Sequence, residues 1–80
     1  MNKKHEVSFI GLGKLGLPLA TNMAKNKIKV LAIDTNKELI SKLKEKKSPW
    51  VENNLKENIF DSYNYIEYST SYSNISTTDF

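Results

Sequence analysis

Three glycines and one aspartate in the first half of the chain have the types and spacing of a phosphate-binding site. Gly11, Gly13 and Gly16 follow the pattern GxGxxG, and Asp34 lies 18 positions after Gly16. The pattern alone is weak evidence. Here, however, it lies between a predicted strand and a predicted helix, and dinucleotide-binding turns place an acidic residue about 20 positions later. The sequence therefore predicts that residues 6–34 bind the pyrophosphate and adenosine ribose of a dinucleotide.

Each glycine of this turn has its own mechanical role. Gly11 permits a tight turn, Gly13 lets the backbone approach the pyrophosphate, and Gly16 lets the following helix pack against the strands. Free amide hydrogens at residues 13–16 and the positive end of the helix dipole favour the two phosphates. The cofactor-binding residues expected in the turn are Gly11, Leu12, Gly13, Lys14, Leu15 and Gly16.

The remaining cofactor contacts are expected at the end of the second strand. The carboxylate of Asp34 would accept hydrogen bonds from the ribose hydroxyls, and Thr35 follows it. The negative charge of Asp34 would repel a 2′-phosphate, so NAD is preferred to NADP, although Lys37 is close enough in sequence to tolerate a phosphate. The competing interpretation is a plain strand-to-helix turn with Asp34 as a strand-end residue, which would produce the full spacing only by coincidence.

Hydrophobic patterns predict the elements that position this site. Short β-branched and aromatic runs predict strands at residues 7–10, 28–33 and 65–68. Residues 15–25 place apolar side chains three and four positions apart, which predicts a helix with one buried face. That face is expected to contain Leu15, Leu19, Ala20, Met23 and Ala24. Strand, helix and strand in succession require a right-handed crossover and therefore parallel strands.

The connection to the third strand is longer than a minimal repeat. Asn36 is expected to cap a second helix that ends near Lys46 and buries Leu39, Ile40 and Leu43. Residues 49–51 should be extended, and residues 52–60 should form a short helix with Leu55 and Ile59 one turn apart. A helical turn is expected around Tyr72 and Ile75.

These elements define an α/β fold, a Rossmann-type parallel sheet that contains the first three strands and their crossover helices. In the usual doubly wound sheet a fourth strand pairs with the first, and no such strand is predicted here. Without it the first strand would present an unpaired apolar edge, which folded proteins normally cover. We therefore interpret residues 1–80 as the N-terminal part of an NAD-binding domain in a longer enzyme.

Composition argues against several other functions. The chain has 12 basic residues, all lysine, against 9 acidic ones. Nucleic-acid binding is not expected, because it depends heavily on arginine and on clustered positive charge. There is no cysteine and hence no thiolate metal site or cysteine nucleophile, and His5 is expected to be solvated, so neither a metal site nor a catalytic residue is predicted. No apolar run approaches the roughly 18 to 20 residues that cross a bilayer, so a cytoplasmic location is expected.

The chain resembles the UDP-glucose/GDP-mannose dehydrogenase family, the nucleotide-sugar 6-dehydrogenases. The resemblance lies in Phe9-Ile10-Gly11-Leu12-Gly13, in Gly16-Leu17-Pro18-Leu19-Ala20, in Asp34, and in the later Pro49, Glu52 and Leu55. The chain departs from the family at Lys14, commonly aromatic, at Asn53, commonly a second proline, and at Leu39, often basic.

The resemblance implies an enzyme that oxidises the C6 alcohol of a UDP- or GDP-sugar to a carboxylate in two NAD-dependent steps. In that family the oxidation passes through a cysteine-bound thiohemiacetal, and the catalytic groups lie far downstream of this segment. The full-length protein is expected to form a homo-oligomer. Two alternatives stay open at this point: the cofactor domain of a β-hydroxyacid dehydrogenase, and a non-catalytic NAD-sensing regulatory domain.

Overall fold

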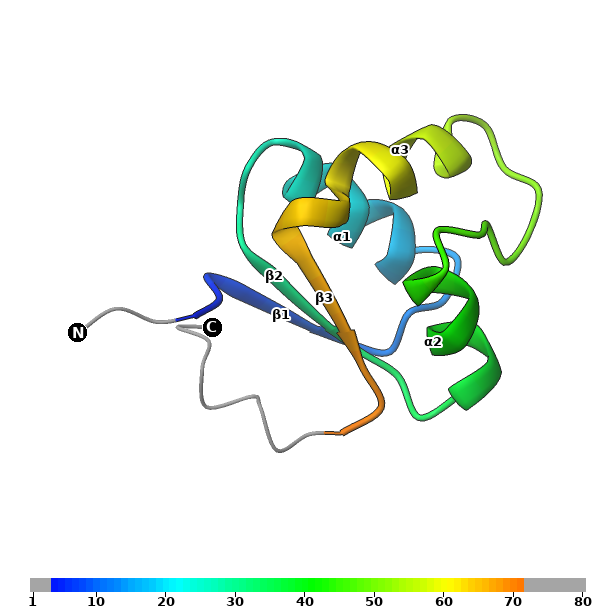
Figure 1. The fold of residues 1–80 in the computed structure, drawn as a ribbon, viewed down its shortest axis with the longest axis horizontal. Helices are drawn as coiled ribbons and strands as arrows, with labels where there is room; N and C mark the ends of the chain where they lie inside the picture. The colour runs from blue at the N-terminus through cyan, green and yellow to red at the C-terminus, as the bar shows by residue number, and fades with distance from the viewer. Residues whose placement is uncertain (1–3, 72–80) are drawn as a thin grey trace.

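The computed structural model describes residues 4–71, which form a three-stranded parallel sheet with helices between the strands (Figure 1). The strands are β1 (Val7–Ile10), β2 (Val30–Ile33) and β3 (Ile66–Ser69), in the order β1-β2-β3. Val7 lies beside Val30, and Val30 lies beside Ile66. All three predicted strands are confirmed, and because they are parallel and in register their carboxyl ends meet at one edge of the sheet.

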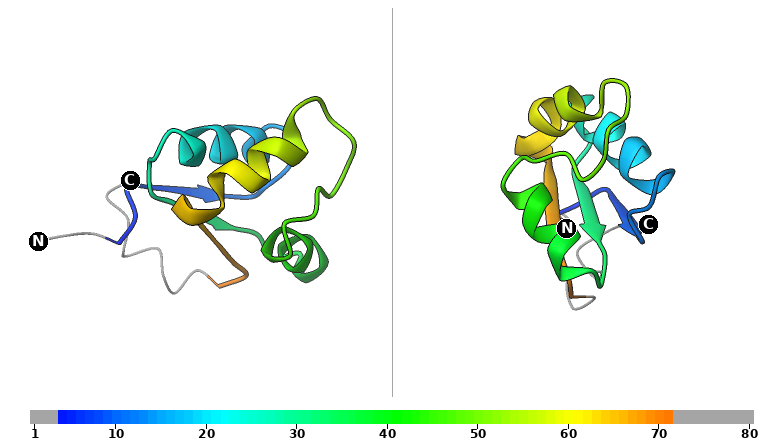
Figure 2. Two further views of the ribbon diagram at one scale, coloured as in Figure 1. Left: turned by 45° about the horizontal axis from the view of Figure 1, so that its top comes forward. Right: turned by 90° about the vertical axis from the view of Figure 1, so that its right-hand side faces the viewer.

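The helices are α1 (Gly16–Lys25), α2 (Lys37–Lys44) and α3 (Leu55–Ser62), and a single 3-10 turn, η1 (Tyr63–Tyr65), leads into β3. Helices α1 and α3 pack against each other and lie over the same face of the sheet (Figures 1 and 2). Helix α2 lies near the carboxyl ends of the strands and contacts β3 (Figure 1). Because β1 and β2 are parallel neighbours, the loops that follow them lie beside each other.

The buried face of α1 differs from the predicted one. Leu15 is 81% exposed and Leu19 is 56% exposed, so their assignment to the core was wrong. The stripe that is buried consists of Leu17, Ala20, Thr21 and Ala24. Gly16, Ala20 and Ala24 follow one another at intervals of four and so lie along one side of the helix, and at Gly16 that side is close to the carbonyl oxygen of Gly11. Bulky leucines at positions 15 and 19 therefore lie on the flank of the helix.

The second crossover follows the prediction in outline, with shifted bounds. The side chain of Asn36 accepts a hydrogen bond from the amide of Leu39 at 3.1 Å, so the predicted helix cap is confirmed. Helix α3 begins three residues later than predicted, because Asn54 has a left-handed φ of 64° that cannot continue a helix. Leu55 and Ile59 are buried as predicted. The turn expected around Tyr72 and Ile75 lies outside the described residues.

The core lies between the sheet and the helices. Its buried residues include Leu17, Ala24, Val30, Ala32, Leu43, Leu55 and Ile59. Within residues 4–71 no helix has the length and apolar character to cross a membrane.

Candidate dinucleotide-binding site

The loop after β1 is a tight turn that only glycine permits at two positions. Gly11 has a φ of +91°, a conformation that L side chains rarely adopt, and its amide donates to the carbonyl of Ile33 at 2.8 Å. A Cβ at Gly16 would lie 2.5 Å from the carbonyl oxygen of Gly11. Gly11 therefore makes the turn, and Gly16 lets α1 start directly against it.

The amino end of α1 is open to solvent and has unpaired donors. Leu15 occupies the N-cap position and makes no side-chain cap, and the first turn contains no acidic residue. Within residues 4–71, the amides of residues 13–16 donate to no acceptor, whereas the amide of Leu17 bonds to the carbonyl of Gly13 at 3.0 Å. A Cβ at Gly13 would meet no atom within 4 Å. Free amides, the positive end of the helix dipole and open space at Gly13 are the features that an incoming pyrophosphate requires.

The carboxylate of Asp34 lies directly beside this turn. Its Oδ2 accepts a hydrogen bond from the amide of Leu12 at 2.8 Å, and its Oδ1 accepts one from the amide of Asn36 at 2.9 Å. A carboxylate has about four acceptor positions, so each oxygen keeps capacity for a further donor such as a ribose hydroxyl. Sequence spacing predicted that Asp34 and the turn would be close, but it did not predict this direct bond.

The other residues expected to bind cofactor have different environments. The side chain of Leu12 is 1% exposed and belongs to the core, so only its backbone faces the turn. Lys14 and Thr35 are exposed. Leu15, at 81% exposure, presents its side chain to solvent beside the open end of α1. The structure thus brings residues 11–16 and Asp34 together, and the groups they offer to a ligand are mainly backbone amides and one carboxylate.

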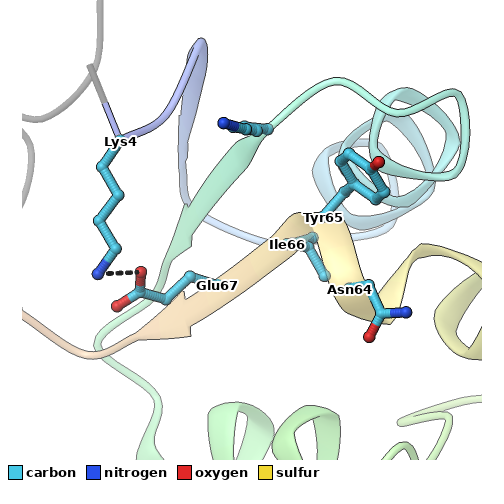
Figure 3. Close-up of a pocket in the computed structure, with 6 residues that line it drawn as sticks. Lys4, Asn64, Tyr65, Ile66 and Glu67 are labelled. Carbon is cyan, nitrogen blue, oxygen red and sulfur yellow. Dashed lines mark ion pairs between the residues drawn. The ribbon is translucent and has the colours of Figure 1, made fainter. Parts of the chain in front are cut away.

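A pocket lies at the opposite edge of the sheet. It has a volume of about 490 Å³ and is lined by Lys4, Lys29, Asn64, Tyr65, Ile66 and Glu67, which lie before or at the start of the strands (Figure 3). Residues 11–16 follow the carboxyl end of β1, so this pocket is not part of the dinucleotide site. In open α/β sheets ligands bind outside the carboxyl ends of the strands.

Beside that pocket, His5 is buried at 4% exposure, so the expectation of a solvated histidine was wrong. Its Nε2 lies 3.0 Å from Oε1 of Glu67, and Nζ of Lys4 lies 3.2 Å from the same oxygen (Figure 3 shows the lysine pair). Partial burial raises the pKa of Glu67, but the hydrogen bond and charge of Lys4, together with His5, outweigh it and leave that pKa lowered. This cluster joins the segment before β1 to β3, and within residues 4–71 no group of three or more potential metal-ligating side chains occurs.

A parallel sheet with helical crossovers, a glycine turn with free amides at a helix start, and a carboxylate at the end of the next strand define a dinucleotide-binding domain of the Rossmann type. Residues 5–80 match the UDP-glucose/GDP-mannose dehydrogenase family, NAD binding domain. The chain belongs to this family, and NAD is the cofactor of the domain. The β-hydroxyacid dehydrogenase and regulatory alternatives are therefore not favoured.

Individual relatives agree with this assignment. The chain is 45% identical over 40 residues to UDP-N-acetyl-D-mannosamine dehydrogenase of Campylobacter jejuni, a match that covers 50% of this chain and 10% of that enzyme. It is similar in structure to UDP-N-acetyl-mannosamine dehydrogenase from Staphylococcus aureus, with a TM-score of 0.77 and 29% identity over 82% of this chain and 16% of the other.

GDP-mannose dehydrogenase from Pseudomonas aeruginosa shares the fold, with a TM-score of 0.78 at 24% identity, again over 82% of this chain and 16% of that enzyme. The chain thus spans between a tenth and a sixth of the length of the relatives that it matches.

Proposed function

We propose that this chain supplies the adenosine and pyrophosphate part of the NAD site in a nucleotide-sugar 6-dehydrogenase, which oxidises the C6 alcohol of a UDP- or GDP-sugar to a uronic acid. The assignment of these residues to the NAD site rests on the direct contact between Asp34 and the glycine turn, with 2.8 Å between Oδ2 of Asp34 and the amide nitrogen of Leu12. This contact supports the proposal because a carboxylate that could accept from ribose then lies beside amides that could bind a pyrophosphate.

The residues present fit this half of NAD. The free amides of residues 13–16 would bind the pyrophosphate, with Gly11 and Gly16 giving the turn its shape. Asp34 would accept hydrogen bonds from the ribose hydroxyls, and Thr35 would lie at the rim of the ribose site. NAD accepts the hydride from the sugar alcohol when the substrate is oxidised, and the groups that bind the sugar and catalyse the reaction would come from other segments.

We also propose that residues 1–80 are the N-terminal part of a larger NAD-binding domain. Exposed apolar side chains support this, because Ile10 on β1 is 55% exposed and Leu19 on α1 is 56% exposed. Further strands beside β1 would cover them. We expect the whole enzyme to be cytoplasmic, since enzymes that use NAD and nucleotide sugars draw on soluble pools of both. A homo-oligomer is a separate expectation for the full-length protein.

The proposal is tested by a steady-state assay of the full-length protein, with formation of NADH followed for a panel of UDP- and GDP-sugars. UDP-N-acetyl-D-mannosamine should be tried first, because the relative at 45% identity is named for that substrate. NADH formation with one member of the panel, two equivalents per sugar oxidised, is the expected result. If no nucleotide sugar reduces NAD, the proposed activity is wrong.

A further inference from the structure

Asp34 is fixed at three points, which is more than a ribose acceptor requires. Its own amide donates to the carbonyl of Ser69 on β3 at 3.1 Å, so the backbone is held by the sheet. Its two carboxylate oxygens accept hydrogen bonds from Asn36 at 2.9 Å and from Leu12 at 2.8 Å. Rotation of the side chain would break both of the last two bonds, and hydrogen bonds to an ionised acceptor are roughly twice as strong as neutral ones.

Leu12 is the residue whose position determines the path of the turn. It lies between Gly11 and Gly13, and glycine loses more conformational freedom on folding than any other residue. The side chain of Leu12 is anchored in the core at 1% exposure, and its amide is held by Asp34. These two anchors fix the backbone between the glycines before any ligand binds.

We propose that Asp34 is a positioning residue for the phosphate-binding turn in addition to its role as ribose acceptor. Through Leu12 it holds the glycine turn in the conformation that presents the free amides of residues 13–16, so ribose and pyrophosphate are recognised by one hydrogen-bonded unit. This inference rests on the proposed function of the site. It also gives a second reason for preference for NAD, because a fixed carboxylate cannot swing aside for a 2′-phosphate.

The direction in which pyrophosphate affinity changes when Asp34 is removed distinguishes a positioning role from a simple contact with ribose. Inorganic pyrophosphate has no ribose, so a residue that only contacts ribose has no favourable interaction with it. Removal of a nearby negative charge should by itself strengthen the binding of an anion. If Asp34 instead holds the turn, its removal should weaken the binding of pyrophosphate in spite of the lost repulsion.

The experiment compares the full-length wild type with Asp34→Ala, Asp34→Asn and Glu38→Ala. Glu38 is an exposed acid in the first turn of α2, so its removal is a control for charge near the site. Binding of NAD and of inorganic pyrophosphate is measured by calorimetry, and hydrogen exchange is measured at the amide of Leu12. Exchange at this amide reports the hydrogen bond itself and does not depend on any ligand.

We expect Asp34→Ala to speed exchange at Leu12 by about tenfold or more, the loss of one charge-assisted hydrogen bond, and to weaken pyrophosphate binding. Asp34→Asn keeps an oxygen that accepts from Leu12, so it should restore most of the pyrophosphate affinity and slow the exchange again. Glu38→Ala should leave Leu12 exchange unchanged.

Pyrophosphate binding in Asp34→Ala that equals or exceeds that of the wild type, with Leu12 exchange unaltered, would overturn the inference and leave Asp34 as a ribose contact only. A wild type that fails to bind NAD would instead overturn the proposed function. In that case exchange at Leu12 still decides whether Asp34 holds the turn.

Discussion

Gly13 and Gly16 belong to the same turn, yet replacement by alanine should change the stability of the fold in opposite directions at the two positions. A Cβ at Gly16 would lie 2.5 Å from the carbonyl oxygen of Gly11, whereas a Cβ at Gly13 would meet nothing within 4 Å. The obstacle at Gly16 is backbone, which cannot rotate away as a flexible side chain can. The pair therefore separates the packing role of the turn from its ligand-binding role.

The magnitudes follow from these contacts. For Gly16→Ala the turn and the helix must separate by about 0.9 Å to move from 2.5 Å to an ordinary contact of 3.4 Å. Overpacking of this kind costs about 1–3 kcal/mol, and the better helix propensity of alanine returns up to about 1 kcal/mol. We expect a net loss of about 1–2 kcal/mol in the free energy of unfolding, together with loss of NAD binding because the turn is displaced.

Gly13→Ala should leave the fold intact. Among the glycines only Gly11 has a positive φ, so alanine fits the backbone at Gly13, and a compatible change from glycine to alanine stabilises a protein by about 0.4–1 kcal/mol. Its methyl group would, however, occupy the space through which the pyrophosphate approaches. NAD affinity should therefore fall by about tenfold or more, which corresponds to about 1.4 kcal/mol.

Thermal unfolding and calorimetric titration with NAD, both on the full-length protein, measure the two effects separately. Gly16→Ala should melt earlier than the wild type and bind NAD poorly, whereas Gly13→Ala should melt slightly later than the wild type and also bind NAD poorly. Equal melting temperatures for the two variants would refute the packing argument. Wild-type NAD affinity in Gly13→Ala would refute the placement of the pyrophosphate.

Three further changes test the fold around the site. The hydroxyl of Tyr68 is buried without a hydrogen-bond partner among residues 4–71, so Tyr68→Phe should raise the free energy of unfolding by about 1 kcal/mol. Denaturant titration measures this change. A decrease of similar size in the free energy of unfolding would show that the hydroxyl does have a hydrogen-bond partner. Asn36→Ala removes the cap of α2 and should cost about 1 kcal/mol, whereas an unchanged melting temperature would mean that the cap is dispensable. Despite partial burial, Lys4 and His5 hold the pKa of Glu67 in the folded protein below its ordinary value, so the ionised Glu67 stabilises the fold, and this contribution is lost as the pH falls through the lowered pKa. Glu67→Gln should therefore reduce the loss of stability at acid pH. An identical dependence of stability on pH in the variant and the wild type would count against the interaction of Glu67 with Lys4 and His5.

The parts of the fold that depend on neighbouring residues were predictable from sequence. The strands at Val7–Ile10 and Val30–Ile33 combine β-branched residues with glycine or aspartate at their ends, and these local signals need no tertiary context. The Asn36 cap is likewise a contact over three residues. The turn itself could be predicted because the glycines stand at fixed spacings between a strand and a helix, and at Gly11 the backbone takes a positive φ that favours glycine.

The errors occur where a side chain responds to elements far away in the chain. Leu15 and Leu19 have the helical spacing of core residues, but spacing alone fits more than one face of a helix. The face that is buried begins at Gly16, where the helix starts against the carbonyl oxygen of Gly11, and it contains Leu17, Ala20, Thr21 and Ala24. His5 looked solvated because its neighbours are polar, whereas its partner Glu67 lies 62 positions away.

The contact between Asp34 and Leu12 was predictable in part, because the two residues were identified from local sequence patterns but the bond between them depends on long-range packing. Both residues were expected at the cofactor site, Asp34 for its charge and Leu12 for its place in the turn, but each was expected to act toward the ligand alone. Their 2.8 Å hydrogen bond spans 22 positions and forms only because parallel pairing of β1 with β2 brings the two loops together. The spacing of an acid about 20 positions after a glycine turn therefore reflects more than the span of a dinucleotide. In this chain it is also the spacing at which the acid can hold the turn.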